Sequence, residues 1–196
     1  MSNRKIGIFF GTETGTTRLI AKKIHKLLGA EQADKPVNVN RIQAADLLQY
    51  DALILGTPSY GVGDIPGLSA GCLERNWEEF LAQFGQPDLA GKRIAFFGLG
   101  AQERYADRFA SSLMALYTIF KDLGADMVGD WSTDGYTFEH SASVVEGRFV
   151  GLVIDQRTQG MHTEERLRSW VEQVKPLLLE KLTPSQAAGN LQGATA

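Results

Sequence analysis

Residues 6 to 18 combine an apolar run with a cluster of small and hydroxyl-bearing residues, a pattern suited to holding an anion. The apolar run stops at Gly11, and five of the next six residues are Thr or Gly. A helix that begins here presents unpaired backbone N–H groups and a partial positive charge. The segment therefore predicts a strand, a tight turn and a helix that binds a phosphate monoester through the hydroxyls of Thr12, Thr14, Thr16 and Thr17 and nearby amides. An ordinary turn with Thr16 as a helix cap is the alternative.

The spacing of this loop differs from that of two commoner phosphate-binding loops. Three residues separate Gly11 from Gly15, and Thr16 stands where a Walker A loop has lysine. The dinucleotide fingerprint of three spaced glycines is also absent. We therefore expect neither a nucleoside triphosphate nor a dinucleotide.

Two later loops each place an aromatic side chain beside glycine-rich backbone. Thr57 to Gly67 contains Tyr60, and Gly98 to Tyr105 ends on Tyr105. A planar ligand stacks favourably between two such rings. Together with the first loop, they predict a flat, phosphorylated ligand.

The elements that must position these loops alternate between strand and helix patterns. Apolar strands are predicted at residues 5–10, 37–42, 51–55 and 93–97, with a fifth near 125–131 that resumes at 149–154. Helical periodicity is predicted after the first strand, through Trp77 to Phe84, from Phe109 to Leu123, and over residues 164–182. This alternation predicts an α/β domain with a parallel sheet covered on both faces. Ligands of such sheets bind outside the carboxyl ends of the strands, where the three loops would converge.

Composition narrows the class of protein. The chain has 196 residues, 43% of them hydrophobic, with a net charge of −3 and no basic block, so a nucleic-acid partner is not expected. No apolar run approaches a membrane span, and the single Cys72, expected to be a packed residue, fits a reducing compartment. The three histidines lack metal-ligand spacing. We expect a cytoplasmic, monomeric protein without a metal, with one domain over residues 1–182 and a disordered tail over 183–196.

Several motifs together resemble the long-chain flavodoxins. The resemblance runs from Ile6 to about Leu179 and is carried by Phe10-Gly-Thr-Glu-Thr-Gly-Thr-Thr17, Leu55-Gly-Thr-Pro58, Pro66-Gly-Leu68, Trp77-Glu-Glu-Phe80, Phe97-Gly-Leu-Gly100 and Trp131-Ser-Thr-Asp-Gly-Tyr136. It implies a doubly wound, three-layer fold with a five-stranded parallel sheet in the order 2-1-3-4-5. The segment 132–148 is similar to the insertion that divides the fifth strand in the long-chain group. Segments such as Ile8-Phe-Phe-Gly-Thr12, Val39-Asn-Arg41, Leu68-Ser-Ala-Gly-Cys72 and Arg148-Phe-Val-Gly-Leu152 are most similar to flavodoxins of nitrogen-fixing bacteria.

The resemblance implies non-covalent FMN and a site built from all three loops. Thr12 to Thr17 would hold the phosphate, Thr57 and Pro58 would border the ribityl chain and the ring, and Tyr60 and Tyr105 would be the inner and outer stacking residues. The residues implied are Thr12, Glu13, Thr14, Gly15, Thr16, Thr17, Thr57, Pro58, Ser59, Tyr60, Gly61, Val62, Gly63, Gly98, Leu99, Gly100, Ala101, Gln102 and Tyr105.

The implied function is low-potential, one-electron transfer on the semiquinone/hydroquinone couple, not catalysis. The partners would be a flavodoxin reductase or an equivalent donor, and the nitrogenase iron protein as acceptor. Asp64, Glu74, Glu78, Glu79 and Glu103 are expected to steer a basic partner, although a solvated helix face explains Glu78 and Glu79 equally well. Val62 and Ala101 stand where relatives carry acids, and Arg104 adds a cation, so we expect a potential tens of millivolts less negative than in acid-rich relatives.

Alternative functions remain at this point. A flavodoxin serving another donor and acceptor, an NAD(P)H:quinone reductase on the same fold, and a flavin-free descendant each fit part of the pattern. A response-regulator receiver does not, because Phe10-Gly-Thr and Gly56-Thr-Pro occupy the places of its acidic residues.

Overall fold

The computed structural model describes residues 5–60 and 63–182. The helices are α1 (Thr16–Leu28), α2 (Ala44–Leu48), α3 (Trp77–Phe84), α4 (Ser112–Asp122) and α5 (Thr163–Leu182), with short 3-10 turns η1 (Val39–Arg41), η2 (Ala106–Arg108) and η3 (Gly160–His162). The strands are β1 (Gly7–Phe10), β2 (Val37–Asn38), β3 (Ala52–Thr57), β4 (Arg93–Leu99), β5 (Asp126–Val128), β6 (Trp131–Ser132), β7 (Val144–Val145), β8 (Arg148–Phe149) and β9 (Leu152–Ile154). The predicted Gly61 and Val62, and the tail from residue 183, lie outside the described residues.

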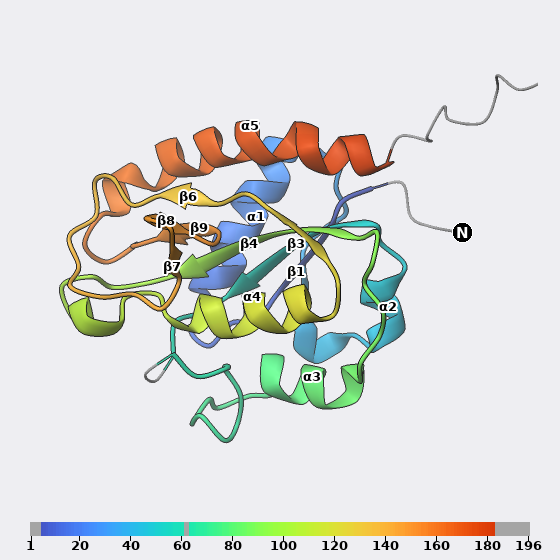
Figure 1. Ribbon diagram of the computed structural model, residues 1–196, viewed down its shortest axis with the longest axis horizontal. Helices are drawn as coiled ribbons and strands as arrows, with labels where there is room; N and C mark the ends of the chain where they lie inside the picture. The colour runs from blue at the N-terminus through green and yellow to red at the C-terminus, as the bar shows by residue number, and fades with distance from the viewer. Residues whose placement is uncertain (1–4, 61–62, 183–196) are drawn as a thin grey trace, which may run out of the picture.

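The main sheet is parallel and has the order β2-β1-β3-β4-β5, as expected. The fifth position is shared by two strands, because β5 pairs with the first half of β4 and β9 with the second half. Helices α1 and α5 cover one face of this sheet, and α3 and α4 cover the other (Figure 1). The doubly wound, three-layer prediction is confirmed.

The cores on the two faces follow from the alternation of side chains along the strands. On β3, Leu53 and Leu55 pack toward α3 and α4, whereas Ala52 and Ile54 pack toward α1 and α5. Successive side chains of a strand point to opposite faces, so a strand covered on both sides must be apolar throughout. All six residues of β3 are buried.

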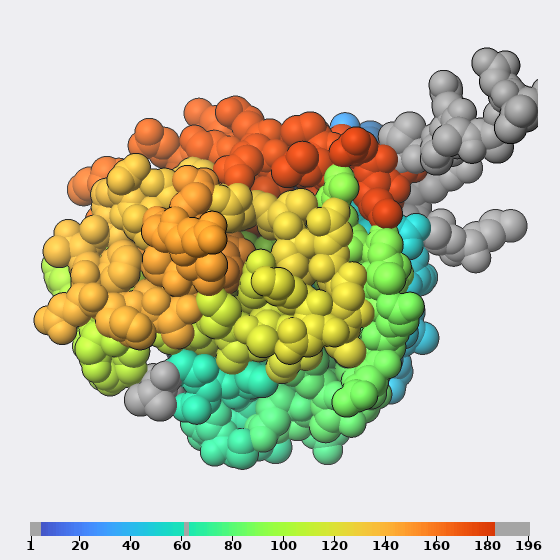
Figure 2. Space-filling view, viewed as in Figure 1, coloured from blue at the N-terminus to red at the C-terminus, as the bar shows by residue number. Residues whose placement is uncertain are grey.

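The segment between the two halves of the fifth strand forms a small sheet of its own. Strands β6, β8 and β7 pair antiparallel in that order, and β7 and β8 are joined by the two-residue turn Glu146-Gly147. In the space-filling view this orange segment lies beside the yellow residues of α4 (Figure 2). The long-chain insertion therefore packs against the helix that follows the second aromatic loop.

Three details differ from the sequence-based expectations. The predicted strand 37–42 is paired only at Val37–Asn38, because the Asn38 side chain accepts a hydrogen bond from the N–H of Asn40 and starts η1. The short helix α2 was not predicted. Phe109 was expected within a helix, but it precedes α4 and packs against Gly100, where a Cβ would lie 2.2 Å from its ring.

Candidate cofactor site at the carboxyl edge of the sheet

The first loop is shaped by its contacts with Asn76 and by a hydrogen bond within the loop. A Cβ on Gly11 would lie 1.9 Å from Oδ1 of Asn76, so only glycine fits there. Asn76 is buried at the start of α3 and donates from Nδ2 to the carbonyl of Thr12 at 3.2 Å. Gly15 has a φ of +90°, and its N–H donates to Oγ1 of Thr12 at 3.1 Å. The loop is thus fixed between the end of β1 and the start of α3.

The N-terminus of α1 is left open by this arrangement. No side chain caps it, and its first turn carries no acid. The first N–H groups of a helix have no partner within the helix, and they favour an anion. The hydroxyl of Thr17 lies in the same turn, is only 1% exposed, and has no hydrogen-bond partner among the described residues. A buried hydroxyl without a partner is costly, so this turn fits an incoming acceptor such as a phosphate.

The remaining side chains of the first loop take different positions. Thr14 is exposed, Thr16 is partly exposed, and Thr12 is buried. Glu13 turns outward and accepts a hydrogen bond from the N–H of Leu73 at 3.0 Å. The carboxylate of Glu13 therefore supports the neighbouring loop.

The second loop carries Tyr60 on a firmly held main chain. Thr57 and Pro58 are buried, Ser59 is partly buried, and the Thr57 hydroxyl donates to the carbonyl of Pro58. The Tyr60 hydroxyl donates to the carbonyl of Gly71 at 2.6 Å, and the N–H of Gly63 donates to the carbonyl of Tyr60 at 3.3 Å. The partly exposed Tyr60 ring thus lies beside the segment 67–73.

The third loop carries Tyr105 between two arginines. The guanidinium carbons of Arg104 and Arg108 lie 5.2 and 5.0 Å from the centre of the Tyr105 ring. This is within the range of cation–π attraction. Arg108 also pairs with Asp107 at 2.7 Å. The partly exposed Tyr105 ring is therefore held on a positively charged edge.

Backbone groups of the third loop are largely engaged. Gly98 and Leu99 are part of β4, and the N–H of Gly100 donates to the carbonyl of Ile154. The N–H of Gln102 donates to the buried carboxylate of Asp155 at 2.9 Å, and the Gln102 side chain accepts from the N–H of Thr137. Of Gly100, Ala101 and Gln102, only Ala101 has an N–H without a hydrogen-bond partner within the described residues, which leaves it available to a ligand.

Two of the acidic residues expected to steer a partner also hold the main chain of the protein. Glu79 accepts from the N–H groups of Asn76 and Leu68, and Glu78 accepts from the N–H of Ser69. Burial raises the pKa of Glu79, but these N–H groups outweigh it and hold the pKa below its usual value. The two carboxylates fasten the segment 67–76 to the start of α3 and remain partly exposed, so their role in steering a partner stays a prediction.

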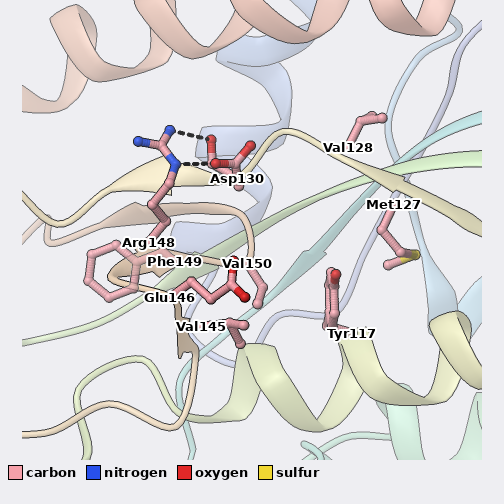
Figure 3. A pocket seen from close by; sticks show the side chains of 9 residues that line it. All are labelled: Tyr117, Met127, Val128, Asp130, Val145, Glu146, Arg148, Phe149 and Val150. Carbon is pink, nitrogen blue, oxygen red and sulfur yellow. Dashed lines mark hydrogen bonds and ion pairs between the residues drawn. The ribbon is translucent and has the colours of Figure 1, made fainter.

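Two hollows flank the third loop and the insertion. A groove of about 660 Å³ lies beside the third loop and is lined by Gln102, Glu103, Ala106, Thr137, Phe138, Glu139, Thr158, Gln159, Met161 and His162. A smaller hollow of about 240 Å³ lies between α4, β5 and the hairpin β7–β8, with the ion pair Arg148–Asp130 at its rim (Figure 3). The smaller hollow contains none of the predicted ligand-binding residues.

Other site types are not represented in the described ranges 5–60 and 63–182. No three His, Cys, Asp or Glu residues there are grouped as metal ligands. None of the helices there could span a membrane. Cys72 is buried, and burial together with the neighbouring Glu13 raises the pKa of its thiol to about 11.

Three residues that shape these loops escaped the sequence analysis. Asn76 begins a capping box with Glu79, a pattern visible in Asn-Trp-Glu-Glu. Asp155 directly follows a buried strand, where polar residues gather at the ligand edge of the sheet. No sequence pattern of this kind marks Ser112.

The chain is similar to known proteins over most of its length. Residues 8–170 match the family model described as Flavodoxin. A flavodoxin of Klebsiella pneumoniae is 49% identical over 174 residues, 89% of this chain and 98% of that protein, and one from Synechocystis sp. is 38% identical over the same shares. The solved structure of Fusobacterium nucleatum flavodoxin bound to flavin mononucleotide superposes with a TM-score of 0.77 at 31% identity, covering 89% of this chain and 98% of that one.

Proposed function

The chain belongs to the flavodoxin family, and we propose that it carries single electrons on non-covalent FMN to the nitrogenase iron protein. Membership alone gives the coarser function: flavodoxins are FMN-binding electron-transfer proteins, not enzymes. We further propose which residues bind FMN, that the nitrogenase iron protein is the acceptor, and that the protein is cytoplasmic and monomeric.

The open turn at the start of α1 carries the assignment of the cofactor site. Its N–H groups and the Thr17 hydroxyl, which lack a side-chain cap and a partner within residues 5–60 and 63–182, would bind the phosphate of FMN. The threonine hydroxyls of the loop would surround the same group. The fit is chemical as well as geometric, because a buried donor gains most from a charged acceptor.

The two tyrosines would enclose the ring. Tyr60, held by the hydrogen bond from its hydroxyl to Gly71, would cover the inner face, and Tyr105 would cover the outer face. Such enclosure excludes water and disfavours additional negative charge on the ring. The N–H of Ala101 would donate to the polar edge of the ring. Once bound, FMN supplies the one-electron chemistry, and the protein supplies its position and electrostatic surroundings.

Purified protein tests the cofactor assignment. We expect a yellow protein that releases FMN on denaturation, and an apoprotein that binds one FMN with quenching of flavin fluorescence. Anaerobic reduction should proceed in two separate one-electron steps. A colourless protein that fails to take up FMN would contradict the assignment, and bleaching in one two-electron step would point to a quinone reductase.

The acceptor rests on the segments that resemble flavodoxins of nitrogen-fixing bacteria, Ile8–Thr12 and Leu68–Cys72 among them. We expect reduced protein to support acetylene reduction by purified nitrogenase when dithionite is absent. A reduced ferredoxin known to drive the same nitrogenase serves as the positive control. If the control supports turnover and this protein does not, another acceptor must be sought.

A further inference from the structure

A single hydroxyl holds the main chain of the inner aromatic residue from both sides. Oγ of Ser112 accepts from the N–H of Tyr60 at 3.1 Å and donates to the carbonyl of Tyr60 at 3.0 Å. The two residues are 52 positions apart, and Ser112 is 1% exposed. The first residue of α4 thus fastens the second loop to the body of the domain.

We infer that Ser112 is a positioning residue for the cofactor ring, acting through the main chain of Tyr60. The inference rests on the proposed function, because Tyr60 matters in this way only if it covers the ring. Ser112 lies outside the three ligand loops, yet it would set how tightly the ring is held and how that affinity changes when the ring is reduced.

The hydroxyl can act in this way because the start of α4 is itself fixed. Ala110 has a φ of +51°, which a residue with a side chain rarely adopts. The buried Ser143 of the insertion donates to the carbonyl of Ala110 at 2.8 Å and accepts from the N–H of Met114 at 3.0 Å. Ser111 accepts from the N–H of Ala142 at 3.1 Å. The insertion therefore holds the turn of backbone that presents Ser112.

The remaining contacts of Tyr60 would not replace this hydroxyl. The hydrogen bonds to Gly71 and from Gly63 both stay within the second loop and its continuation. They fix the shape of the loop but not its distance from α4. Without the hydroxyl, the N–H of Tyr60 loses its acceptor, and the loop loses this tie to α4.

The variant Ser112→Ala tests the inference, with Thr163→Val as the matched control. Thr163 is also buried, and its hydroxyl also makes a hydrogen bond, to Oε1 of Gln156 at 3.3 Å, but within the described residues no hydrogen bond joins it to Tyr60 or Ser112. We expect Ser112→Ala to raise the Kd for FMN about fivefold, as for the loss of a typical hydrogen bond. The Kd for riboflavin, which lacks the phosphate, should rise by a similar factor.

The midpoint potential separates positioning from general destabilisation. We expect Ser112→Ala to shift the first one-electron potential by about 28 mV or more, the equivalent of a threefold change in relative affinity between oxidation states. Thr163→Val should lower the stability of the apoprotein, leave the potential within about 10 mV and leave both Kd values within a factor of about 1.5.

The outcomes distinguish this inference from the proposed function. If the wild-type protein binds no FMN, the proposed function fails. If it binds FMN and Ser112→Ala leaves Kd and potential unchanged, or Thr163→Val shifts them equally, the positioning role is refuted. Ser112→Cys, which puts a slightly larger and weaker donor and acceptor at the same position, should give an intermediate shift and replaces Ser112→Ala should that variant not fold.

Discussion

The hydroxyl of Thr17 should weaken the apoprotein and strengthen cofactor binding. It is 1% exposed and has no partner among the described residues. Burying an unpaired hydroxyl costs about 1–3 kcal/mol, whereas a hydrogen bond to a charged group contributes about 1.5–3 kcal/mol. Replacing Thr17 with valine keeps the branched shape and removes only this group. The two properties should therefore change in opposite directions.

For Thr17→Val we expect the apoprotein to gain about 1 kcal/mol in the free energy of unfolding, measured by urea titration. The Kd for FMN, measured by quenching of flavin fluorescence, should rise by a factor of about 10–100. Thr163→Val is the matched control, because the Thr163 hydroxyl is also buried but has a partner, Oε1 of Gln156 at 3.3 Å. That variant should lose about 1 kcal/mol and leave the Kd unchanged.

Two results would refute the reasoning on Thr17. If Thr17→Val is less stable as apoprotein, the hydroxyl has a protein partner and is not held ready for a ligand. If the Kd for FMN stays the same while riboflavin binding is also unchanged, the hydroxyl does not contact the phosphate.

Three further predictions concern Tyr136, Cys72 and Glu146. Burial raises the pKa of Tyr136 to about 12, so this side chain ionises first in the unfolded chain as the pH rises above 10. The free energy of unfolding should therefore fall by about 2–3 kcal/mol between pH 10 and pH 12. Tyr136→Phe should flatten the dependence of the urea midpoint on pH. The raised pKa of Cys72 predicts alkylation by iodoacetamide at pH 8 about 100-fold slower than for an ordinary thiol, with the rate still rising beyond pH 10 in a mass-spectrometric assay. Glu146 has a φ of +50° in the turn between β7 and β8, so Glu146→Asn should raise the thermal midpoint by about 2 °C, and an unchanged or lower midpoint would contradict strain at this turn.

Local patterns were enough to predict the frame of the fold. The buried strands β1, β3 and β4 are continuous apolar runs, and α3 has the predicted bounds, Trp77–Phe84. The divided fifth strand was also predicted, because both halves are apolar. The small sheet of β6, β7 and β8 was not, since strands of two residues carry no periodicity and are defined by their pairing.

The candidate site could likewise be predicted from local patterns only in part. Glycine and threonine spacing revealed the first loop, because backbone shape and hydroxyl chemistry are properties of a short segment. The contacts that fix the loops join distant residues: Asn76 to Thr12, Asp155 to Gln102, and Ser112 to Tyr60. A single polar residue gives no sign of its distant partner. Likewise, the sequence gives no sign that Glu78 and Glu79 accept the backbone N–H groups that the structure places against them.

The charges around Tyr105 bear directly on the proposed acceptor. The guanidinium groups of Arg104 and Arg108 lie against the ring of Tyr105, and the second is partly neutralised by Asp107. At a distance of about 8–10 Å in a solvent-like dielectric, one such cation stabilises a negative ring by about 0.4–0.5 kcal/mol, or about 20 mV. Two exposed cations thus shift the potential by tens of millivolts and remain sensitive to salt. That shift is small beside the effect of enclosing a charge in an apolar sandwich. In the proposed site the arginines would adjust the strength of the reductant, while the enclosure of the ring by Tyr60 and Tyr105 would have the larger effect on its potential.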